Sequence, residues 1–372
     1  MGEIFLMEGE TPHLHPSWVN VWGRSTTDSA YLTMNHLYAK IYMRYNAKRK
    51  GCAVLKAFEL INKVKNNIMR VFVGSEKAVD LMLAALLSEG HVLIEDVPGS
   101  GKTVLAKSFA KSLDCSFRRI QFTPDLLPAD ITGVKFFDMK SSEFRFVPGP
   151  AFANVVLADE INRATPKTQA GLLECMEEHQ ITVEGDTYAL ADPFMVIATQ
   201  NPVESLGVFP LPEAQLDRFM MKLSLGYPTR EQSVSILGRF EKEDPLRTLS
   251  PVVSADDVIS ARHEVSGYYV HPDLLDYISA VTEATRYKSG VILGAGTRAS
   301  LALLRASKAI AAVYGRTYVL PDDIKTASVP VLAHRLVLKT SLGDSRNAAE
   351  QLVSEILEQI TVPSEDFEKY KI

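Results

Sequence analysis

The sequence has few cysteines and no long apolar run, and each shortage argues against a class of protein. Its three cysteines, Cys52, Cys115 and Cys175, are far apart and show neither CxxC nor Cys/His spacing. A disulfide framework or a zinc site is therefore not expected. No apolar run approaches the roughly 20 residues that cross a bilayer, and the first residues carry acids where a signal peptide carries bases. The sequence thus predicts a cytoplasmic protein without a membrane span.

Positively charged residues are also fewer than negatively charged ones. Lys and Arg number 40 against 45 Asp and Glu, so the formal net charge is −5. A protein dedicated to nucleic acid normally shows a basic patch, and the obvious basic cluster here is RYNAKRKG at 44–51. We therefore expect no nucleic-acid partner. The eight histidines show no HExxH or paired ligand spacing, so no intrinsic metal site is expected either.

From about residue 57 onward, short apolar segments alternate with helical periodicity. This alternation is typical of a parallel sheet with helices on both faces. Two further segments, 133–149 and 180–190, have the pattern of β-hairpins, the second turning at Glu184-Gly185. The predicted sheet strands are 91–96, 117–122, 154–160, 193–199 and 220–225.

Beyond Pro228 the predicted strands stop and the periodic segments are helical. Thr229 and Gln232 have capping-box spacing, and Pro272 and Pro321 stand where a first-turn proline is tolerated. We therefore expect three parts along the chain. They are an N-terminal extension of unknown role (1–56), an αβα nucleotide-binding core (57–228) and a mainly helical domain (229–372).

The segment HVLIEDVPGSGKT, 91–103, runs from an apolar strand through a glycine-rich turn into a helix. Glycines allow the backbone to wrap an anion closely, and the N–H groups at a helix start favour phosphate. In such loops the lysine reaches the β- and γ-phosphates and the following hydroxyl binds Mg²⁺. The general pattern GxxxxGK[ST] has glycine where this sequence has Asp96. The predicted ATP-binding residues here are Pro98, Gly99, Ser100, Gly101, Lys102, Thr103 and Val104.

A pair of acids ends the apolar strand NVVLADE. Asp159 can face Mg²⁺ through water, together with the Thr103 hydroxyl, while Glu160 can act as general base on the attacking water. Because adjacent strand residues point to opposite sides, we expect the two carboxylates to point apart. A third strand ends at Asn201, whose amide could hold that water; a turn capped by Asn-Pro is the alternative. The sequence therefore predicts a site for Mg²⁺ and ATP.

Several longer runs resemble the MoxR family of AAA+ ATPases. They follow the family's order within about 57–362, and the resemblance implies a P-loop core with a five-stranded parallel sheet, hairpin inserts and a mainly α-helical lid. It also implies homo-oligomeric rings, commonly hexamers, with each ATP between neighbouring subunits. The runs are LADEINRATPKTQAGLLECMEE, QFTPDLLPADITG, ATQNP, LPEAQLDRF and GAGTRAS.

The resemblance assigns roles to residues outside the phosphate loop. Arg218 is similar to an arginine finger that reaches the ATP of the adjacent subunit; an ion pair with an acid on its own surface is the alternative. Arg298 is similar to the sensor 2 arginine, which acts on the nucleotide of its own or a neighbouring subunit. Val73 and Gly74 match the segment that flanks adenine, and core packing is their alternative.

The sequence leaves more than one class of function open. The resemblance implies ATP-driven remodelling or maturation of protein partners, often proteins with von Willebrand factor A domains, and hairpins that face the ring's pore or a client. The alternatives are a nucleic-acid motor similar to AAA+ helicase subunits and a chelatase-type ATPase subunit. A motor needs a positive surface that releases counterions from nucleic-acid phosphates. The acidic balance of this chain disfavours that alternative.

Overall fold

The structure is a computed structural model, and it describes residues 56–96, 99–201, 207–241, 244–339 and 345–363. All of these residues belong to one compact unit, Gly51–Ile372. Within this unit the boundary expected at 228/229 stays a prediction. Nearly all of the predicted N-terminal extension lies outside the described residues. In the part of the chain that is described, no helix is long and apolar enough to span a bilayer.

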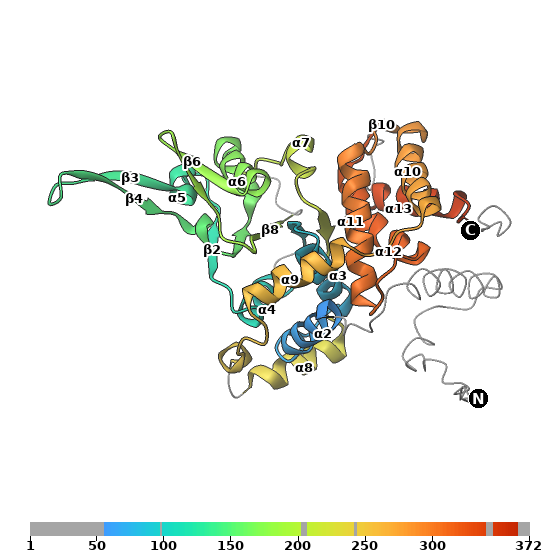
Figure 1. Cartoon of the computed structure of the whole chain (residues 1–372), viewed down its shortest axis with the longest axis horizontal. Coiled ribbons are helices and arrows are strands. Elements are labelled where there is room, and N and C mark those ends of the chain that lie inside the picture. Colours follow the sequence, from blue (N-terminus) through green and yellow to red (C-terminus); the bar gives the residue numbers. More distant parts are fainter. Residues whose placement is uncertain (1–55, 97–98, 202–206, 242–243, 340–344, 364–372) are drawn as a thin grey trace, which may run out of the picture. The chain divides into compact units, whose positions relative to one another are not determined.

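A five-stranded parallel sheet forms the centre of the fold (Figure 1). Each predicted sheet segment overlaps one of its strands, with β8 ending one residue beyond the predicted segment 193–199, and the predicted parallel sheet is confirmed. Every residue of the inner strand β5 is buried, as expected when helices cover both faces of a sheet. In spatial order the strands are β2 (Phe117–Gln121), β5 (Val155–Asp159), β8 (Met195–Gln200), β1 (Val92–Glu95) and β9 (Met221–Leu223).

Local sequence explains where the core helices begin and end. The Ser75 hydroxyl accepts a hydrogen bond from the Ala78 N–H at 3.2 Å, which starts α3. Pro166 occupies the first turn of α6, and His179 ends that helix with a left-handed φ of 51°. The helices are α2 (Lys56–Met69), α3 (Glu76–Leu87), α4 (Lys102–Ser112), α5 (Pro128–Thr132), α6 (Pro166–Glu178) and α7 (Glu213–Leu216), with the 3₁₀ turns η2 (Pro150–Phe152) and η3 (Ile161–Arg163).

Both predicted hairpins are present. The first consists of β3 (Gly133–Asp138) and β4 (Glu143–Pro148), and Figure 1 shows it projecting away from the sheet. The second, β6 (Gln180–Val183) and β7 (Asp186–Ala189), turns at Glu184 and Gly185, whose φ angles are 51° and 90°. The two hairpins contact each other, because the Phe146 ring stacks on Tyr188 with their centroids 4.2 Å apart.

The rest of the chain is mainly helical, with one difference from the sequence prediction. The Thr229–Gln232 capping box and the first-turn prolines of α10 and α12 are present as expected. However, β10 (Val291–Leu293) and β11 (Val337–Leu338) pair as two short antiparallel strands, which are too short to produce a visible alternation in the sequence. The remaining elements are α8 (Arg230–Phe240), η4 (Pro245–Thr248), α9 (Ala255–Ser266), α10 (Pro272–Tyr287), α11 (Thr297–Val313), α12 (Pro321–Leu332), η5 (Ala333–Arg335) and α13 (Ser345–Gln359).

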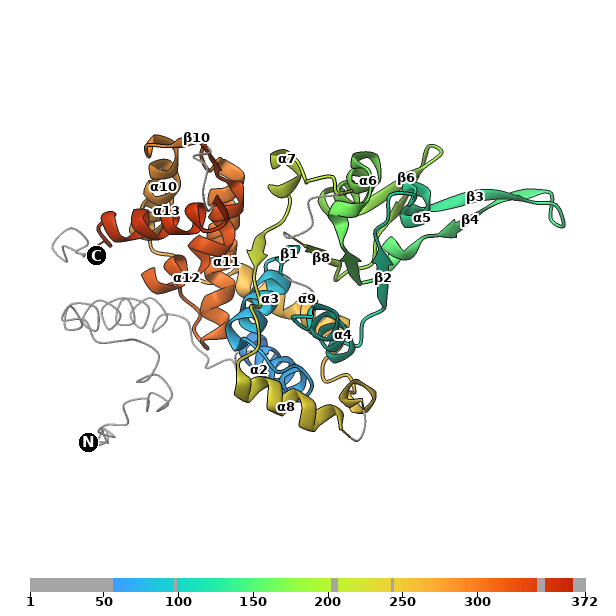
Figure 2. The same ribbon diagram turned by 180° about the vertical axis from the view of Figure 1, so that it is seen from behind.

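Helices α8 and α9 lie against the first helices of the core, as Figures 1 and 2 show from opposite sides. The Arg262 Nε of α9 donates to the Leu86 carbonyl oxygen at 2.9 Å, and an Arg239 Nη of α8 donates to the Met69 carbonyl oxygen at 2.8 Å. These hydrogen bonds tie α8 and α9 to α2 and α3, and α3 leads into β1, the strand before the phosphate loop.

Candidate nucleotide-binding site

The phosphate loop lies between the end of β1 and the start of α4. Gly99 and Gly101 have φ angles of 85° and 86°, in the left-handed region that glycine adopts easily. A Cβ on Gly99 would meet no atom within 4 Å, so the loop faces open space there. The Ser100 hydroxyl is buried and has no hydrogen-bond partner within the described part of the chain. A phosphate group fits this concave backbone, because the loop offers an unused donor and a helix N-terminus.

Lys102 and Thr103 begin α4 beside this loop. The Lys102 ammonium donates to the Asp96 carbonyl oxygen at 2.8 Å. Burial lowers the pKa of Lys102 from its ordinary value, while the negative charges of Asp96, Asp159 and Glu160 oppose that shift. The lysine is therefore within electrostatic reach of both acids predicted for the metal and the base. Val104 is half-buried in the same first turn, and Pro98 lies outside the described residues.

The aspartate at the first loop position has a structural role of its own. Only 6% of Asp96 is exposed, and its Oδ2 accepts hydrogen bonds from the backbone N–H groups of Leu225 at 2.8 Å and Gly226 at 2.9 Å. These two residues follow β9 and precede α8. A glycine, as in the general pattern, could not make this connection. Asp96 thus fastens the start of the phosphate loop to the segment that leads into α8.

The two acids share a neighbour at the end of β5. The Thr199 hydroxyl donates to Asp159 Oδ1 at 2.6 Å and accepts from the Glu160 backbone N–H at 2.9 Å. Glu160 has left the strand, because its φ of 57° is left-handed and it begins η3. The expected divergence by strand alternation therefore does not apply to Glu160. The turn at Glu160 sets the direction of its side chain instead.

Polar side chains of β2 hold both carboxylates. Arg119 donates to Asp159 Oδ2 through Nε at 3.1 Å and Nη2 at 2.7 Å, while Gln121 Nε2 donates to Glu160 Oε2 at 2.7 Å. Arg163, on η3, pairs with the same Glu160 oxygen at 3.1 Å. The sequence prediction missed Arg119, Gln121 and Arg163. The strand spacing carried a signal, since residues 119 and 121 are two apart in FRRIQ and therefore lie on one face of β2, the strand beside β5.

Asn201 follows β8 and is 5% exposed. Its carbonyl oxygen lies 3.5 Å from the Asn162 Nδ2, two residues beyond Glu160. The Asn162 Oδ1 is buried without a hydrogen-bond partner among the described residues. Asn201 thus adjoins the turn that carries the predicted base, while its role in orienting water stays a prediction, and Asn162 is a second amide at this turn that the sequence prediction missed.

A ring links the predicted adenine segment to the phosphate loop. A Cβ on Gly74 would lie 2.5 Å from the Phe72 Cζ, and a Cβ on Gly101 would lie 3.3 Å from the Phe72 Cε2. The Phe72 side chain is buried, while Val73 and Gly74 are half-buried. The structure therefore brings the segment 71–74 beside the loop that would hold the phosphates. Phe72 is the residue that makes this contact, and the sequence prediction did not include it.

The two predicted arginines gather around one acid. Arg218 Nε lies 3.1 Å from Glu177 Oε2, and an Nη of Arg298 bonds the other oxygen of that carboxylate. Arg298 also lies 3.4 Å from Asp217, which in turn accepts a 2.7 Å hydrogen bond from Arg335. The structure brings Arg218 and Arg298 together, although they are far apart in the sequence.

This arginine cluster lies near the N-terminal ends of β1 and β9, whereas the phosphate loop follows the C-terminal end of β1. Met220, two residues beyond Arg218, donates its N–H to the His91 carbonyl oxygen at 2.9 Å, just before β1 begins. The phosphate loop instead follows the other end of β1. Four strand residues at about 3.3 Å each separate these two ends. Neither arginine is therefore beside the phosphate loop of its own chain.

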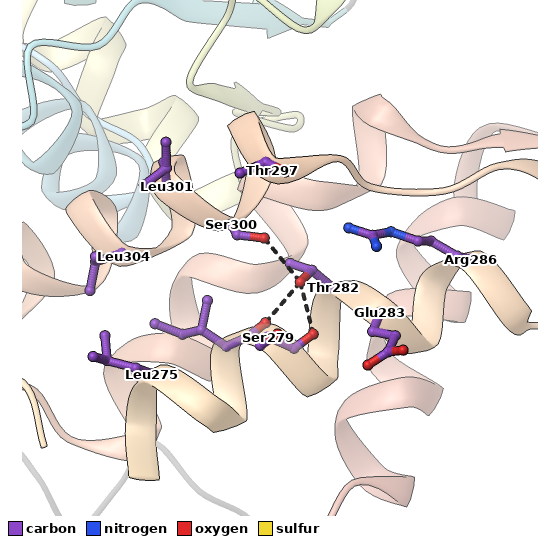
Figure 3. A pocket seen from close by; sticks show the side chains of 10 residues that line it. Leu275, Ser279, Thr282, Glu283, Arg286, Thr297, Ser300, Leu301 and Leu304 are labelled. Atoms are coloured by element: carbon purple, nitrogen blue, oxygen red, sulfur yellow. Dashed lines mark hydrogen bonds between the residues drawn. The ribbon is translucent and has the colours of Figure 1, made fainter. Parts of the chain in front are cut away.

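A cavity of about 470 Å³ lies between α10 and α11, and Thr297, the chain neighbour of Arg298, lines it (Figure 3). Its lining combines leucine side chains with a polar end where the Ser300 hydroxyl donates to the Thr282 hydroxyl at 3.0 Å. None of the residues predicted to bind nucleotide lines it. The labelled lining residues are Leu275, Ser279, Thr282, Glu283, Arg286, Thr297, Ser300, Leu301 and Leu304.

The donor atoms at the sheet edge suit magnesium. Mg²⁺ prefers hard oxygen ligands and keeps several waters, so one hydroxyl and one carboxylate can hold it when phosphate oxygens supply the rest. Thr103, in the first turn of α4, and Asp159, at the end of β5, are the hydroxyl and the carboxylate predicted for this role. Among the described residues, no group of three or more His, Cys, Asp or Glu gathers to hold a metal ion unaided. The residues present fit a metal that arrives together with a nucleotide.

Family comparisons agree with this architecture. The ATPase family associated with various cellular activities (AAA) matches residues 91–221, and the AAA lid domain matches residues 283–356. The first match contains the phosphate loop, both acids and Arg218, and the second contains Arg298. The fold and the site therefore define an AAA+ ATPase with a helical lid.

Individual relatives show which family of AAA+ ATPases the chain belongs to. YeaC of Bacillus subtilis, a protein without an assigned function, is 48% identical over 304 residues, which cover 82% of this chain and 95% of YeaC. Chaperone MoxR1 of Mycobacterium tuberculosis is 41% identical over 305 residues, 80% of each chain. A crystal structure from Cytophaga hutchinsonii, described as a candidate ATPase, is 38% identical with a TM-score of 0.75, covering 83% of this chain and 97% of that one. The chain belongs to the MoxR family of AAA+ ATPases, as its motifs predict.

Proposed function

We propose that this protein hydrolyses ATP with Mg²⁺ and uses the energy to remodel or mature a protein partner. The observation that carries the proposal is the convergence of Lys102, Asp159 and Glu160 at one edge of a parallel sheet, beside an open glycine-framed loop. Lys102 binds the β- and γ-phosphates, and Thr103 and Asp159 hold the metal. Bound Mg²⁺ supplies positive charge that offsets the charge developing on the phosphate oxygens.

Glu160 is the general base in this proposal, and Asn201 orients the water. In the described arrangement the Gln121 amide and the Arg163 guanidinium both contact Glu160 Oε2. These two donors engage the lone pairs of that oxygen, so in this arrangement it is not free to accept a proton from water. We therefore propose that the described arrangement is a resting state, and that the active state frees the Glu160 carboxylate.

We further propose that the protein works as a homo-oligomeric ring, in the form of a hexamer. Arg218 and Arg298 lie at the sheet edge opposite the phosphate loop of their own chain, which supports action on the nucleotide of a neighbouring subunit. In the ring, the phosphates of the neighbour's ATP would replace Glu177 as the partner of Arg218. A guanidinium suits this exchange because its fork binds carboxylates and phosphates alike.

The proposed partner is a protein, such as one with a von Willebrand factor A domain, and the β3–β4 hairpin is the proposed contact. Near the turn of this hairpin, Phe137 is 51% exposed, Met139 84% and Phe144 70%. Clustered exposed apolar side chains of this size are typical of a protein-binding surface rather than a nucleic-acid groove. The relative MoxR1 is named a chaperone, which agrees with a protein client.

Changing Phe137 and Phe144 together to serine should leave ATP binding unchanged and abolish the effect of a partner on ATP turnover. The two rings contact each other edge to face, 5.3 Å apart, at a distance from the phosphate loop along the hairpin. Partner-stimulated phosphate release measures the effect. Leu237→Ser on α8, where the side chain is 72% exposed, is the matched control. Unchanged stimulation in the hairpin variant would rule out this contact.

Lys102→Ala tests the nucleotide site directly. Loss of a charged hydrogen bond of about 1.5–3 kcal/mol should weaken ATP binding about 10- to 100-fold. The fold should survive, because the lysine donates to a single carbonyl oxygen. Titration with a fluorescent ATP analogue gives the affinity, and Lys107→Ala, an exposed lysine of the same helix, is the control. Wild-type affinity in the Lys102 variant would contradict the proposed function.

A further inference from the structure

We propose that Arg119 is a positioning residue that occupies the metal-facing oxygen of Asp159 until Mg²⁺ and nucleotide arrive. This inference rests on the proposed function, since it concerns the same metal. Arg119 donates to Asp159 Oδ2 through two nitrogens, Nε at 3.1 Å and Nη2 at 2.7 Å. Such a charge-assisted contact neutralises the carboxylate, as a bound metal ion would.

The other oxygen of Asp159 is held by a different kind of group. Its Oδ1 accepts the Thr199 hydroxyl at 2.6 Å, and Thr199 is fully buried. The Arg119 side chain, in contrast, is 45% exposed and comes from the edge strand β2, so it can turn into solvent. Thr199 can therefore fix the carboxylate while Arg119 leaves it. Oδ2 is the oxygen that becomes free for the metal or for a water bound to the metal.

Electrostatics favour this departure when the metal arrives. Lys102, Arg119 and Arg163 already surround the acids Asp159 and Glu160. A divalent cation close to Asp159 adds two positive charges within a few ångströms of the guanidinium, and like charges at that separation repel strongly even near a protein surface. Arg119 and Mg²⁺ therefore compete for Asp159, and the competition lowers the apparent affinity for the metal.

The same arginine connects the metal position to the base. Arg119 Nη2 donates to Gln121 Oε1 at 2.8 Å, and Gln121 Nε2 donates to Glu160 Oε2 at 2.7 Å. A continuous chain of hydrogen bonds thus runs from Asp159 through Arg119 and Gln121 to Glu160. When Arg119 leaves, the Gln121 amide loses the contact that orients it. Displacement of Arg119 by the metal would therefore loosen the hold on Glu160 and link metal binding to release of the base.

The test is the Mg²⁺ dependence of nucleotide binding, measured with a non-hydrolysable fluorescent ATP analogue at fixed free Mg²⁺ concentrations. In Arg119→Gln we expect half-maximal binding at about tenfold lower Mg²⁺ than in the wild type, because a competing charge is gone. Binding in EDTA should not change. The matched control is Arg118→Gln, which removes an equal charge from the neighbouring position on the opposite face of β2. Its Mg²⁺ dependence should be that of the wild type.

Two results would overturn the inference. One is an unchanged Mg²⁺ dependence in folded Arg119→Gln; the other is loss of analogue binding with and without Mg²⁺, which would make Arg119 a nucleotide ligand. Should the glutamine variant fail to fold by circular dichroism, Arg119→Lys keeps the charge and loses the forked contact with Asp159. It should show a smaller shift in the same direction, and no shift would equally overturn the inference. A wild-type protein that binds no analogue at any Mg²⁺ concentration would instead refute the proposed function.

Discussion

Glu160→Gln is expected to lower ATP turnover about 10³-fold while ATP affinity stays at the wild-type level. Glutamine has nearly the same size as glutamate and can still accept the Gln121 amide through its oxygen, so the local packing should persist. It cannot accept a proton from water at neutral pH. Binding of the phosphates depends on Lys102 and the loop, which this change does not touch. Phosphate release measures turnover, and titration with a fluorescent analogue measures affinity.

The control for this substitution is Glu174→Gln, which removes an exposed carboxylate from α6. It should leave both turnover and affinity unchanged. If Glu160→Gln hydrolysed ATP at a rate near that of the wild type, Glu160 would not be the base. A parallel loss of affinity and turnover would also contradict the assignment, because it would indicate damage to the phosphate loop rather than to proton transfer.

The parts of the site that could be predicted from the sequence are those encoded by neighbouring residues. Two glycines before Lys102 give the loop its backbone conformation, and Asp159 is the last residue of the apolar strand β5. The hairpin turn at Glu184-Gly185 is equally local. In each case the residue types that form the feature are adjacent in the chain, so their pattern is visible without knowledge of the fold.

The parts that could not be predicted depend on strand order. Arg119 and Gln121 reach the acids because β2 pairs with β5, a neighbour that the alternation of helices and strands does not specify. Asp96 similarly finds its partners at Leu225 and Gly226, which are 129 and 130 residues away. Its substitution for glycine looked like a departure from a motif, whereas the fold makes it a link between the loop and α8.

The arginine cluster shows how a local pattern can leave two interpretations open. The sequence offered Arg218 as a finger toward another subunit or as part of an ion pair on its own surface. In the single chain Arg218 does pair with Glu177, yet its position at the far sheet edge keeps it away from its own phosphate loop. Both interpretations can hold in succession, since the partly exposed pair with Glu177 is weak enough to be exchanged for a phosphate.

Arg218→Ala should therefore lower turnover about 10³-fold or more without weakening ATP binding by the same subunit. In the proposed mechanism the affected group would stabilise charge on the phosphate that is transferred, while Lys102 of the same subunit would still hold the nucleotide. Phosphate release and analogue titration again separate turnover from affinity. Arg230→Ala, which removes an exposed arginine at the start of α8, is the control and should be near wild type. Reduced affinity in step with turnover would argue for damage within the subunit.

A mixture of Arg218→Ala and Glu160→Gln subunits decides whether the arginine acts across an interface. Each variant alone lacks one catalytic group at every site. In a ring with head-to-tail interfaces, an Arg218→Ala subunit supplies Glu160 and its Glu160→Gln neighbour supplies Arg218, so about a quarter of the sites in an equal mixture become complete. Turnover should rise toward that fraction of the wild-type rate. A lack of restored activity, although mass measurements showed mixed rings, would contradict action across an interface. Arg218 would then have to act on the ATP of its own subunit. Because it lies near the start of β1 and the phosphate loop follows the end of β1, that would need a large rearrangement.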